Sequence, residues 1–365
     1  MGDNHQNERQ LFSEKMIQIL NQGALNLAMG LGYRMGLFDA MDALRAPSPV
    51  SVISKAAGLN ARYVLEWLGV MATGGIVILS RDSDGQDLFY LPKAHADVIT
   101  RRSGNANLGV YTQEIPLLTA SVYDAVADGF RTGQGISYDH YPRFQRFMGQ
   151  LADAKHNQVL VDLFLPSVEK GKMVEKLNRG ISVCDLGCAE GVALILMAEA
   201  FPNSRFVGLD ISEAILEKAE VNARAKGLRN ITFLKEDAAL LEDQRLLHKT
   251  FDYVTAFDAI HDQTRPLEAL KGAVAILKDG GAFSMVDIAA ASELSRNMDH
   301  PMGMFLYTVS LMHCMPVGLM DGGSGLGMMW GREKAVSMLK KSGFDQVSVE
   351  EIPEDPFNLH FFCRK

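Results

Sequence analysis

The segment that most constrains the fold of this chain is residues 181–191, which read Ile-Ser-Val-Cys-Asp-Leu-Gly-Cys-Ala-Glu-Gly. A short apolar run ends on Asp185, the backbone then passes through Gly187, Ala189 and Gly191, and an apolar stretch follows. Small residues let a ligand approach the backbone, and the first N–H groups of a helix are free to bind it. The pattern therefore predicts a strand, a turn and a helix start, which together form a nucleotide-type site at the carboxyl edge of a parallel sheet.

From residue 181 onward, strand-like and helix-like patterns alternate, which predicts an α/β domain with a parallel sheet covered by helices on both faces. The expected strands are 181–186, 205–210, 231–235, 251–257, 282–287, 347–352 and 358–363. Helices are expected over 192–201, 266–277 and 333–342. Only a short proline-containing turn separates the last two strands. We expect these two to pair antiparallel, because parallel neighbours need a long crossover.

Acidic residues stand at the ends of the first four expected strands, namely Asp185, Asp210, Asp237 and Asp258. Asp210 has the spacing from the turn at which an acid can accept both ribose hydroxyls of a nucleotide. It can equally cap the helix that follows it. Asp237 can accept the amino group of an adenine. Each acid alone is compatible with a cap or turn, but four at one sheet edge favour a binding site.

The first hundred residues predict a separate and mainly helical domain. Apolar residues recur at helical spacing over 11–45, and two shorter helices are expected over 50–58 and from the N-cap candidate Asn60 onward. Two apolar runs on either side of a polar turn, 76–79 and 88–91, predict a β-hairpin. Helix, helix and hairpin is the order of a winged-helix domain.

The charge pattern argues against nucleic acid and anionic membranes as partners. The second short helix carries Arg62 as its only clear cation, with Glu66 one turn later, whereas neutralising phosphates takes several Lys or Arg. The formal net charge of the chain is −8. We therefore expect the domain to serve packing and homodimer formation. No apolar run approaches the ~20 residues of a membrane span and the N-terminus is polar, so we expect a cytoplasmic protein without a membrane partner.

The cysteines and methionines bear on cofactor and pocket chemistry. The four cysteines, Cys184, Cys188, Cys314 and Cys363, form neither a CxxC pair nor a zinc-type Cys/His cluster. This usage is typical of a reducing compartment and predicts a site that needs no metal. Many of the 19 methionines fall in 298–329. They indicate either adaptable core packing or a flexible apolar ligand pocket.

The motifs, taken in order, resemble those of the class I S-adenosylmethionine (SAM)-dependent methyltransferases. Residues 185–191 resemble the D-x-G-x-G-x-G loop of that family, with alanine replacing the middle glycine. Residues 208–210 resemble the motif whose acid binds the ribose, and 237–238 resemble the adenine-binding acid and its neighbour. Residues 277–281 resemble the family's L-K-P-G-G turn, with an aspartate for the proline. Alanine in the loop is small, but a positive φ there costs it more than it would cost glycine.

The resemblance implies a seven-stranded Rossmann-like methyltransferase sheet with an antiparallel last strand, preceded by a mainly α winged-helix domain. The implied domains are a winged-helix and dimerisation domain at 1–100, a helical linker contributing to the pocket at 101–165, and a SAM-binding domain at 166–365. SAM is the implied cofactor, and S-adenosylhomocysteine the product. The implied cofactor-binding residues are Asp185, Gly187, Cys188, Gly191, Asp210, Ile211, Asp237, Ala238, Phe257 and Asp258.

With its N-terminal module, the chain is similar to small-molecule O-methyltransferases, and closer still to uncharacterised bacterial winged-helix methyltransferases with the signature at 257–263, Phe-Asp-Ala-Ile-His-Asp-Gln. In the phenolic O-methyltransferases a His-Asp pair follows the fourth strand, and its histidine is the general base. His261 and Asp262 fall at the matching place. Phe147 and Met148 resemble a segment that lines both the cofactor and the acceptor in that family.

The expected activity is methyl transfer from SAM to a small, largely apolar acceptor, with His261 deprotonating a hydroxyl. A histidine of pKa near 6.5 can do this at neutral pH. His313, in an apolar segment, is a candidate substrate-binding residue or helper of the base, and a core histidine is an equal alternative. An N- or S-acceptor remains open, as does a SAM-binding regulatory protein without catalysis. A dehydrogenase fits the predicted sheet and the 277–281 turn poorly.

Overall fold

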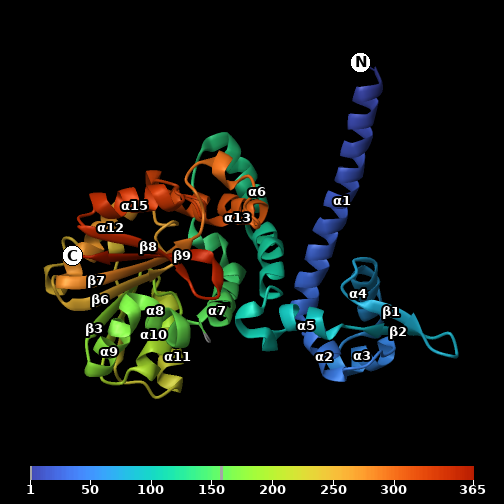
Figure 1. Ribbon diagram of the computed structural model, residues 1–365, viewed down its shortest axis with the longest axis horizontal. Coiled ribbons are helices and arrows are strands. Elements are labelled where there is room, and N and C mark those ends of the chain that lie inside the picture. Colours follow the sequence, from blue (N-terminus) through green and yellow to red (C-terminus); the bar gives the residue numbers. More distant parts are fainter. Residues whose placement is uncertain (1, 157–158) are drawn as a thin grey trace. The chain divides into compact units, whose positions relative to one another are not determined.

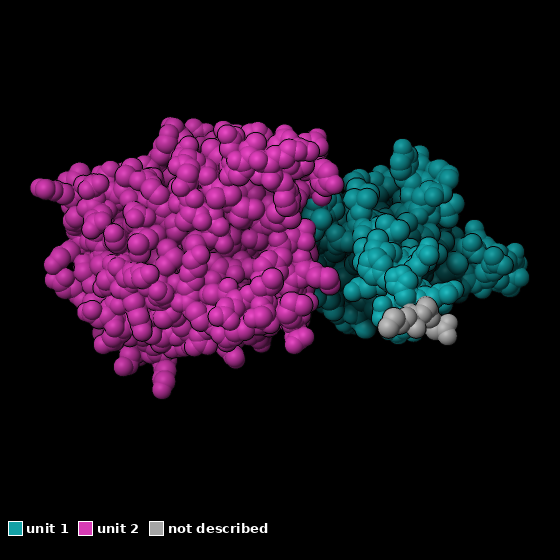
Figure 2. Space-filling model, turned by 90° about the horizontal axis from the view of Figure 1, so that it is seen from above, with its two compact units in different colours: residues 1–117 teal, residues 118–365 magenta. Residues whose placement is uncertain are grey.

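The computed structural model describes residues 2–156 and 159–365 (Figure 1). The chain forms two compact units, residues 1–117 and 118–365 (Figure 2). The division falls inside the segment 101–165, which the sequence presents as a helical linker. Among the helices of these described residues, none is long and apolar enough to cross a membrane.

The first unit is mainly helical, with one β-hairpin. Its elements are α1 (Gly2–Arg34), α2 (Leu37–Leu44), α3 (Val50–Ala57), α4 (Ala61–Thr73), β1 (Ile78–Arg81), β2 (Asp87–Tyr90), α5 (Lys93–Ile99), η1 (Arg101–Ala106) and η2 (Val110–Gln113). The predicted N-cap of α4 is confirmed, because the Asn60 side chain accepts the backbone N–H of Arg62 at 2.9 Å. The predicted hairpin is also confirmed, with β1 pairing antiparallel to β2. Phe38 and Trp67 pack edge to face between α2 and α4.

The second unit begins with helices that lead into the sheet. These are α6 (Glu114–Thr132), which starts just before the division, η3 (Tyr138–His140), α7 (Pro142–His156), η4 (Leu160–Phe164), α8 (Leu165–Ser167), η5 (Val168–Gly171) and α9 (Lys172–Arg179). The alternating part that follows comprises β3 (Ser182–Leu186), α10 (Val192–Ala200), β4 (Arg205–Asp210), α11 (Glu213–Ala225), β5 (Ile231–Lys235), η6 (Ala238–Leu240), η7 (Arg245–Leu247), β6 (Phe251–Phe257), α12 (Pro266–Ile276) and β7 (Leu277–Ile288).

The C-terminal part inserts a helical segment before the last strands. It comprises η8 (Leu294–Asn297), α13 (Gly303–Val309), η9 (Ser310–Cys314), α14 (Met315–Gly318), η10 (Met320–Gly322), α15 (Arg332–Lys341), β8 (Gln346–Ile352) and β9 (Asp355–Arg364). All seven strands expected from the sequence are present. Helix α12 ends one residue earlier than expected, because Leu277 pairs with Phe251 and so belongs to the sheet.

The seven strands form one sheet in the order β5-β4-β3-β6-β7-β9-β8. Strands β3 to β7 are parallel, while β9 runs antiparallel to both β7 and β8. The predicted sheet with an antiparallel last strand is therefore confirmed. The order reverses between β3 and β6, and ligands of such sheets bind outside the carboxyl ends of the strands at that point.

Helices cover both faces of the sheet (Figure 1), and each face has its own apolar core. Successive side chains of a strand point to opposite faces, so Val183 packs under α9 and α10 while Cys184 packs under α12 and α15. Tyr253 and Val254 divide in the same way on β6. The strands that carry the predicted acids are thus anchored on both sides, which holds their carboxyl ends in fixed positions.

Candidate active site

The turn after β3 adopts an unusual backbone conformation at every second residue. Gly187, Ala189 and Gly191 all have positive φ, at 68°, 47° and 75°. The N–H groups of Gly187 and Cys188 both donate to the carbonyl of Leu209 on β4, at 2.8 and 3.0 Å. Alanine therefore holds a left-handed conformation that glycine adopts at lower cost, and such strain often persists at functional sites.

The two glycines are required by space as well as by conformation. A Cβ added to Gly187 would lie 2.7 Å from the Cβ of Ala259, and one added to Gly191 would lie 2.8 Å from the Phe233 ring. Both distances are shorter than real side chains tolerate. The turn therefore packs directly against the loop after β6 on one side and against β5 on the other, with its backbone closely enclosed.

The acids on β4 and after β5 both bind backbone N–H groups. Asp210 accepts the N–H of Ser212 at 2.9 Å and that of Ala189 at 3.1 Å, which ties the end of β4 to the glycine turn. Burial raises the pKa of Asp210, and these backbone donors oppose the rise. Asp237 accepts the N–H of Ala239 at 2.8 Å and a guanidinium hydrogen of Arg265 at 2.7 Å. Both acids thus act as caps in this structure.

The remaining predicted cofactor residues differ in exposure. Asp185 is buried and accepts the hydroxyl of Thr255 at 2.7 Å. Burial, reinforced by Asp210 and opposed by Thr255, raises the pKa of Asp185 to about 7. Cys188 and Ala238 are buried, whereas the Ile211 side chain is exposed.

His261 lies in a buried ion pair at the carboxyl end of β7. Its Nδ1 is 2.8 Å from Oδ1 of Asp287, and its side chain is almost completely buried. The same Oδ1 accepts the N–H of Ile288 at 2.8 Å. Burial disfavours the charged form of His261, but the Asp287 carboxylate together with Cys314 outweighs it and raises the pKa of His261 well above its ordinary value. Burial of a histidine against a fixed carboxylate is the arrangement used to orient a general base.

The sequence neighbour Asp262 has a different partner from the one expected for a His-Asp pair. Its carboxylate accepts the phenol hydrogen of Tyr138, from the short η3 turn. Burial raises the pKa of Asp262, although His261 and Tyr138 oppose the rise. The structure therefore brings Asp262 into the same cluster as His261, but the carboxylate that contacts the imidazole is Asp287. Sequence reasoning missed Asp287, although it ends the fifth strand just as the other acids end theirs.

The segment that carries His313 owes its shape to a proline. Pro316 has no N–H to donate to the carbonyl of Met312, four residues earlier. That carbonyl instead accepts the hydroxyl of Tyr141 at 2.9 Å, and the helix widens into the π-turn η9. The carbonyl of Pro316 accepts the N–H of Ile136 at 2.9 Å. These two hydrogen bonds connect residues 136–141 to the segment around His313.

His313 lies in an aromatic cluster. Its ring is 5.6 Å from that of Tyr138, 4.9 Å from Tyr141 and 4.6 Å from Phe144. Burial lowers the pKa of His313 to about 3, so the ring is neutral. Within the described part of the chain, its Nε2 has no hydrogen-bond partner. Phe147 packs against Phe144 at 5.6 Å.

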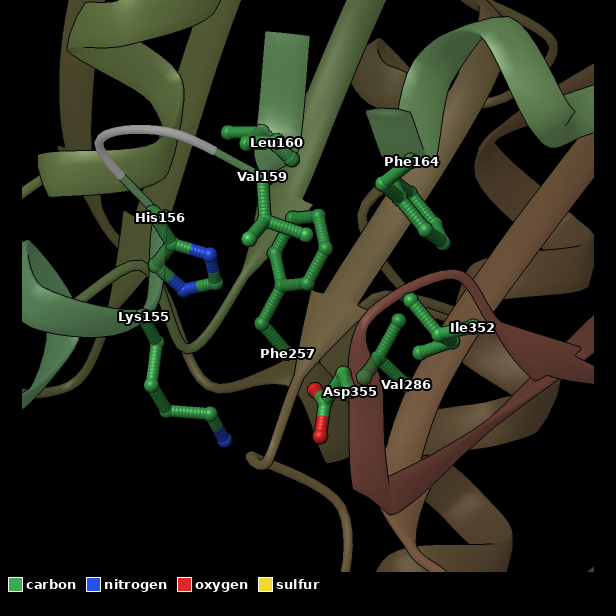
Figure 3. A pocket seen from close by; sticks show the side chains of 9 residues that line it. All are labelled: Lys155, His156, Val159, Leu160, Phe164, Phe257, Val286, Ile352 and Asp355. Carbon is green, nitrogen blue, oxygen red and sulfur yellow. The ribbon is translucent and has the colours of Figure 1, made fainter. Parts of the chain in front are cut away.

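Phe257, the last residue of β6, lines a small pocket (Figure 3), whereas the neighbouring Asp258 is not among its lining residues. The pocket is lined by Lys155, His156, Val159, Leu160, Phe164, Phe257, Val286, Ile352 and Asp355. The Phe257 ring contacts His156 at 5.1 Å and Phe164 at 5.8 Å. Burial lowers the pKa of His156 to about 4, so this side of the pocket is uncharged apart from Lys155 and Asp355. Met148, also expected here, is half-buried on α7 and is not among the lining residues.

Metal ligation finds no support in the part of the chain that the structure covers. Over residues 2–156 and 159–365, no group of three His, Cys, Asp or Glu side chains is placed to hold a metal ion. The four cysteines are buried and form no disulfide bond with one another.

Two domain families match this chain. Residues 177–322 match a family described as a methyltransferase domain, and residues 23–101 match the Rv2258c-like winged HTH domain. Among curated proteins, a demethylmenaquinone methyltransferase of Lactococcus lactis is 32% identical over 109 residues, covering 30% of this chain and 42% of that protein. A sterol 24-C-methyltransferase of Yarrowia lipolytica is 24% identical over 250 residues, covering 67% of this chain and 58% of that protein. An uncharacterised Rickettsia prowazekii protein is 30% identical over 153 residues, covering 39% of this chain and 25% of that protein.

The chain thus spans from a quarter to somewhat more than half of the length of these curated relatives. Solved structures resemble it over nearly its whole length. A putative O-methyltransferase from Nostoc punctiforme has a TM-score of 0.70 at 16% identity, covering 96% of this chain and 98% of that chain. Human N-acetylserotonin methyltransferase, solved in complex with SAM, has a TM-score of 0.68 at 14% identity, covering 97% of each chain. At these identities the likeness shows a shared fold.

Proposed function

We propose that this chain, a methyltransferase-domain protein with an N-terminal winged helix-turn-helix domain, transfers the methyl group of SAM to a hydroxyl of a small, largely apolar acceptor. The observation that carries the proposal is the buried His261–Asp287 pair at the carboxyl edge of the sheet. It lies on the loop that packs against the glycine turn, through the contact between Ala259 and Gly187. The methionine-rich segment 298–329 supports an apolar acceptor.

The residues at this edge fit SAM. The absence of side chains at Gly187 and Gly191 lets the turn pack directly on Ala259 and Phe233, which fixes its backbone at this edge. Asp210 and Asp237 end adjacent strands and can receive the ribose and the adenine. Asp258 adds a buried carboxylate oxygen that lacks a partner among the described residues. When bound, SAM supplies a methyl group already activated for displacement. The proposed cofactor set is completed by Asp185, Cys188, Ile211, Ala238 and Phe257.

His261 then acts as the general base. Asp287 accepts the Nδ1 hydrogen, which leaves Nε2 as the nitrogen that can take a proton. An acceptor hydroxyl gives its proton to Nε2 as its oxygen bonds to the methyl carbon, and Asp287 stabilises the resulting imidazolium. In the proposal Asp262 and Tyr138 fix the loop beside the base, while Phe147, Met148 and His313 contact the acceptor. The unpaired Nε2 of His313 supports this last role.

Cofactor binding gives a direct test of the SAM site. Isothermal titration with S-adenosylhomocysteine should show binding, and Asp210→Ala should weaken it by about 10–100-fold, since a charged hydrogen-bond partner is worth ~1.5–3 kcal/mol. Glu199→Ala, which removes an exposed acid that pairs with Lys226, is the matched control. Absence of binding, or equal binding by Asp210→Ala, would contradict the proposed site.

The first unit supports homodimer formation through α1. Large apolar side chains between Leu11 and Leu31 of this helix are 38–68% exposed: Leu11, Phe12, Met16, Ile17, Ile19, Leu20, Leu27 and Leu31. A concentration of exposed apolar side chains of this kind marks an interaction surface, and a second copy of α1 offers an apolar surface to cover it. We expect light scattering to give the mass of a dimer for the unaltered protein and of a monomer for Phe12→Glu/Leu20→Glu. A dimer that survives both changes would exclude this surface.

A further inference from the structure

Asp258 has a left-handed backbone conformation, which is uncommon outside glycine although Asp and Asn adopt it more readily than other residues. It directly follows β6 with φ at 48°, and its N–H donates to the carbonyl of Val286 at 2.9 Å. Such residues persist where the surroundings fix them, and they gather at binding sites. The conformation therefore points to a function for the Asp258 side chain.

Only one of the two carboxylate oxygens of Asp258 has a partner among the described residues. Its Oδ2 is 2.5 Å from Nζ of Lys155, in an ion pair whose side chains are 23% and 19% exposed. Its Oδ1 is buried and has no hydrogen-bond partner among the described residues. Burial would raise the pKa of Asp258, but Lys155 and His261 outweigh it and lower this pKa, so the group is a carboxylate. An unused oxygen on a buried carboxylate is costly unless a ligand supplies the donor.

Lys155 lies near the end of α7 and donates to this acid. Two other polar groups of the pocket, Asp355 and His156, have environments of their own. Asp355 is held by the amide of Asn358 at 2.7 Å and by the N–H of Phe357 at 3.0 Å. His156 is neutral because burial lowers its pKa to about 4. The ion pair is therefore a matched pair of opposite charges beside the apolar Phe257 ring.

The place of this ion pair matches the part of SAM that still lacks partners in the proposed site. Ala259, the next residue, packs on Gly187 of the turn. Asp210 and Asp237 are assigned to the ribose and the adenine. What remains of the ligand is its amino-acid end, which carries one ammonium and one carboxylate. We propose that Asp258 and Lys155 open their ion pair to clamp this end, Asp258 accepting from the ammonium and Lys155 donating to the carboxylate.

The clamp rests on the proposed SAM site and is tested by comparing two ligands. S-adenosylhomocysteine has the amino-acid end, whereas 5′-methylthioadenosine has the same nucleoside and lacks it. Lys155→Met and Asp258→Asn should each weaken S-adenosylhomocysteine binding by about 10–100-fold in isothermal titration and leave 5′-methylthioadenosine binding within about twofold. Asparagine tolerates the left-handed conformation, so Asp258→Asn preserves the backbone. Lys155→Arg should keep the preference for S-adenosylhomocysteine.

Lys226→Met is the matched control, because it removes an exposed lysine that pairs with Glu199 on the helical surface. If Lys155→Met weakens both ligands equally or neither, the ion pair is structural and the clamp is overturned while the SAM site stands. If the unaltered protein binds neither ligand, the proposed function fails, and the clamp fails with it. Thermal denaturation of each variant shows whether its fold is intact.

Discussion

Replacing His261 with alanine is expected to slow methyl transfer to a hydroxyl acceptor by about 10²–10⁴-fold while S-adenosylhomocysteine binding stays within about twofold, since general-base catalysis contributes roughly this factor. A hydroxyl is a weak nucleophile until it loses its proton, and His261 is the buried histidine with a fixed carboxylate on Nδ1. Asp185 and Asp210 lie on other strands and Asp237 follows another strand, so their positions should survive the change. Single-turnover transfer of labelled methyl to a panel of phenols, amines and thiols measures the effect.

The panel of acceptors distinguishes a catalytic role of His261 from a structural one. His248→Ala is the matched control, because His248 is exposed and bonds only the carbonyl of Glu242. Loss confined to phenols, with amines or thiols still methylated, would identify His261 as a base needed only for hydroxyl acceptors. Full turnover of phenols by His261→Ala would reject the role. Loss of cofactor binding as well would show that the residue mainly supports the structure.

The fold could be predicted in detail because its signals are local. Each strand of the sheet is a short apolar run with a turn at each end, and the acids Asp185, Asp210, Asp237 and Asp258 stand at the predicted edge. The glycine turn was also predicted, but the contacts that hold Ala189 at a positive φ were not. Ala189 adopts φ of 47° because the carbonyl of Leu209 and the carboxylate of Asp210 hold the turn on both sides.

The partners within the candidate site could not be predicted, because they are set by contacts between distant parts of the chain. The acid that binds His261 lies 26 residues away on β7, and the phenol that binds Asp262 lies 124 residues away. Adjacency in the sequence favoured His261 with Asp262. Parallel strands instead bring the ends of β6 and β7 together, which places Asp287 beside the loop after β6.

The carboxylate of Asp287 should matter nearly as much as the imidazole it holds. Asp287→Asn is expected to lower turnover of a hydroxyl acceptor by about 10²–10⁴-fold, as for other histidine bases deprived of their orienting acid. The amide can donate to Nδ1 as well as accept from it, so the tautomer is no longer fixed. Asp287 Oδ1 also accepts the N–H of Ile288, and an asparagine oxygen can keep that contact. Asp279→Asn, at an exposed ion pair on the same strand, is the control.

The pH dependence of turnover tests the direction in which Asp287 shifts the pKa of His261. Asp287 raises the pKa of His261 above its ordinary value, so the free base forms only above that raised pKa and turnover by the unaltered protein should increase with pH beyond neutrality. Without the carboxylate, the raising effect of Asp287 is lost and the pKa of His261 falls from its value in the unaltered protein, so the acidic limb of kcat/KM should move to lower pH in Asp287→Asn. An unmoved limb, or a shift to higher pH, would contradict the pairing.

The raised pKa of His261 also predicts how stability depends on pH. The His261–Asp287 pair stabilises the fold fully below pH ~6.5, and this contribution is lost as pH rises through the raised pKa. The stability deficit of Asp287→Asn in denaturant titrations should therefore be largest on the acidic side and shrink as the pH increases.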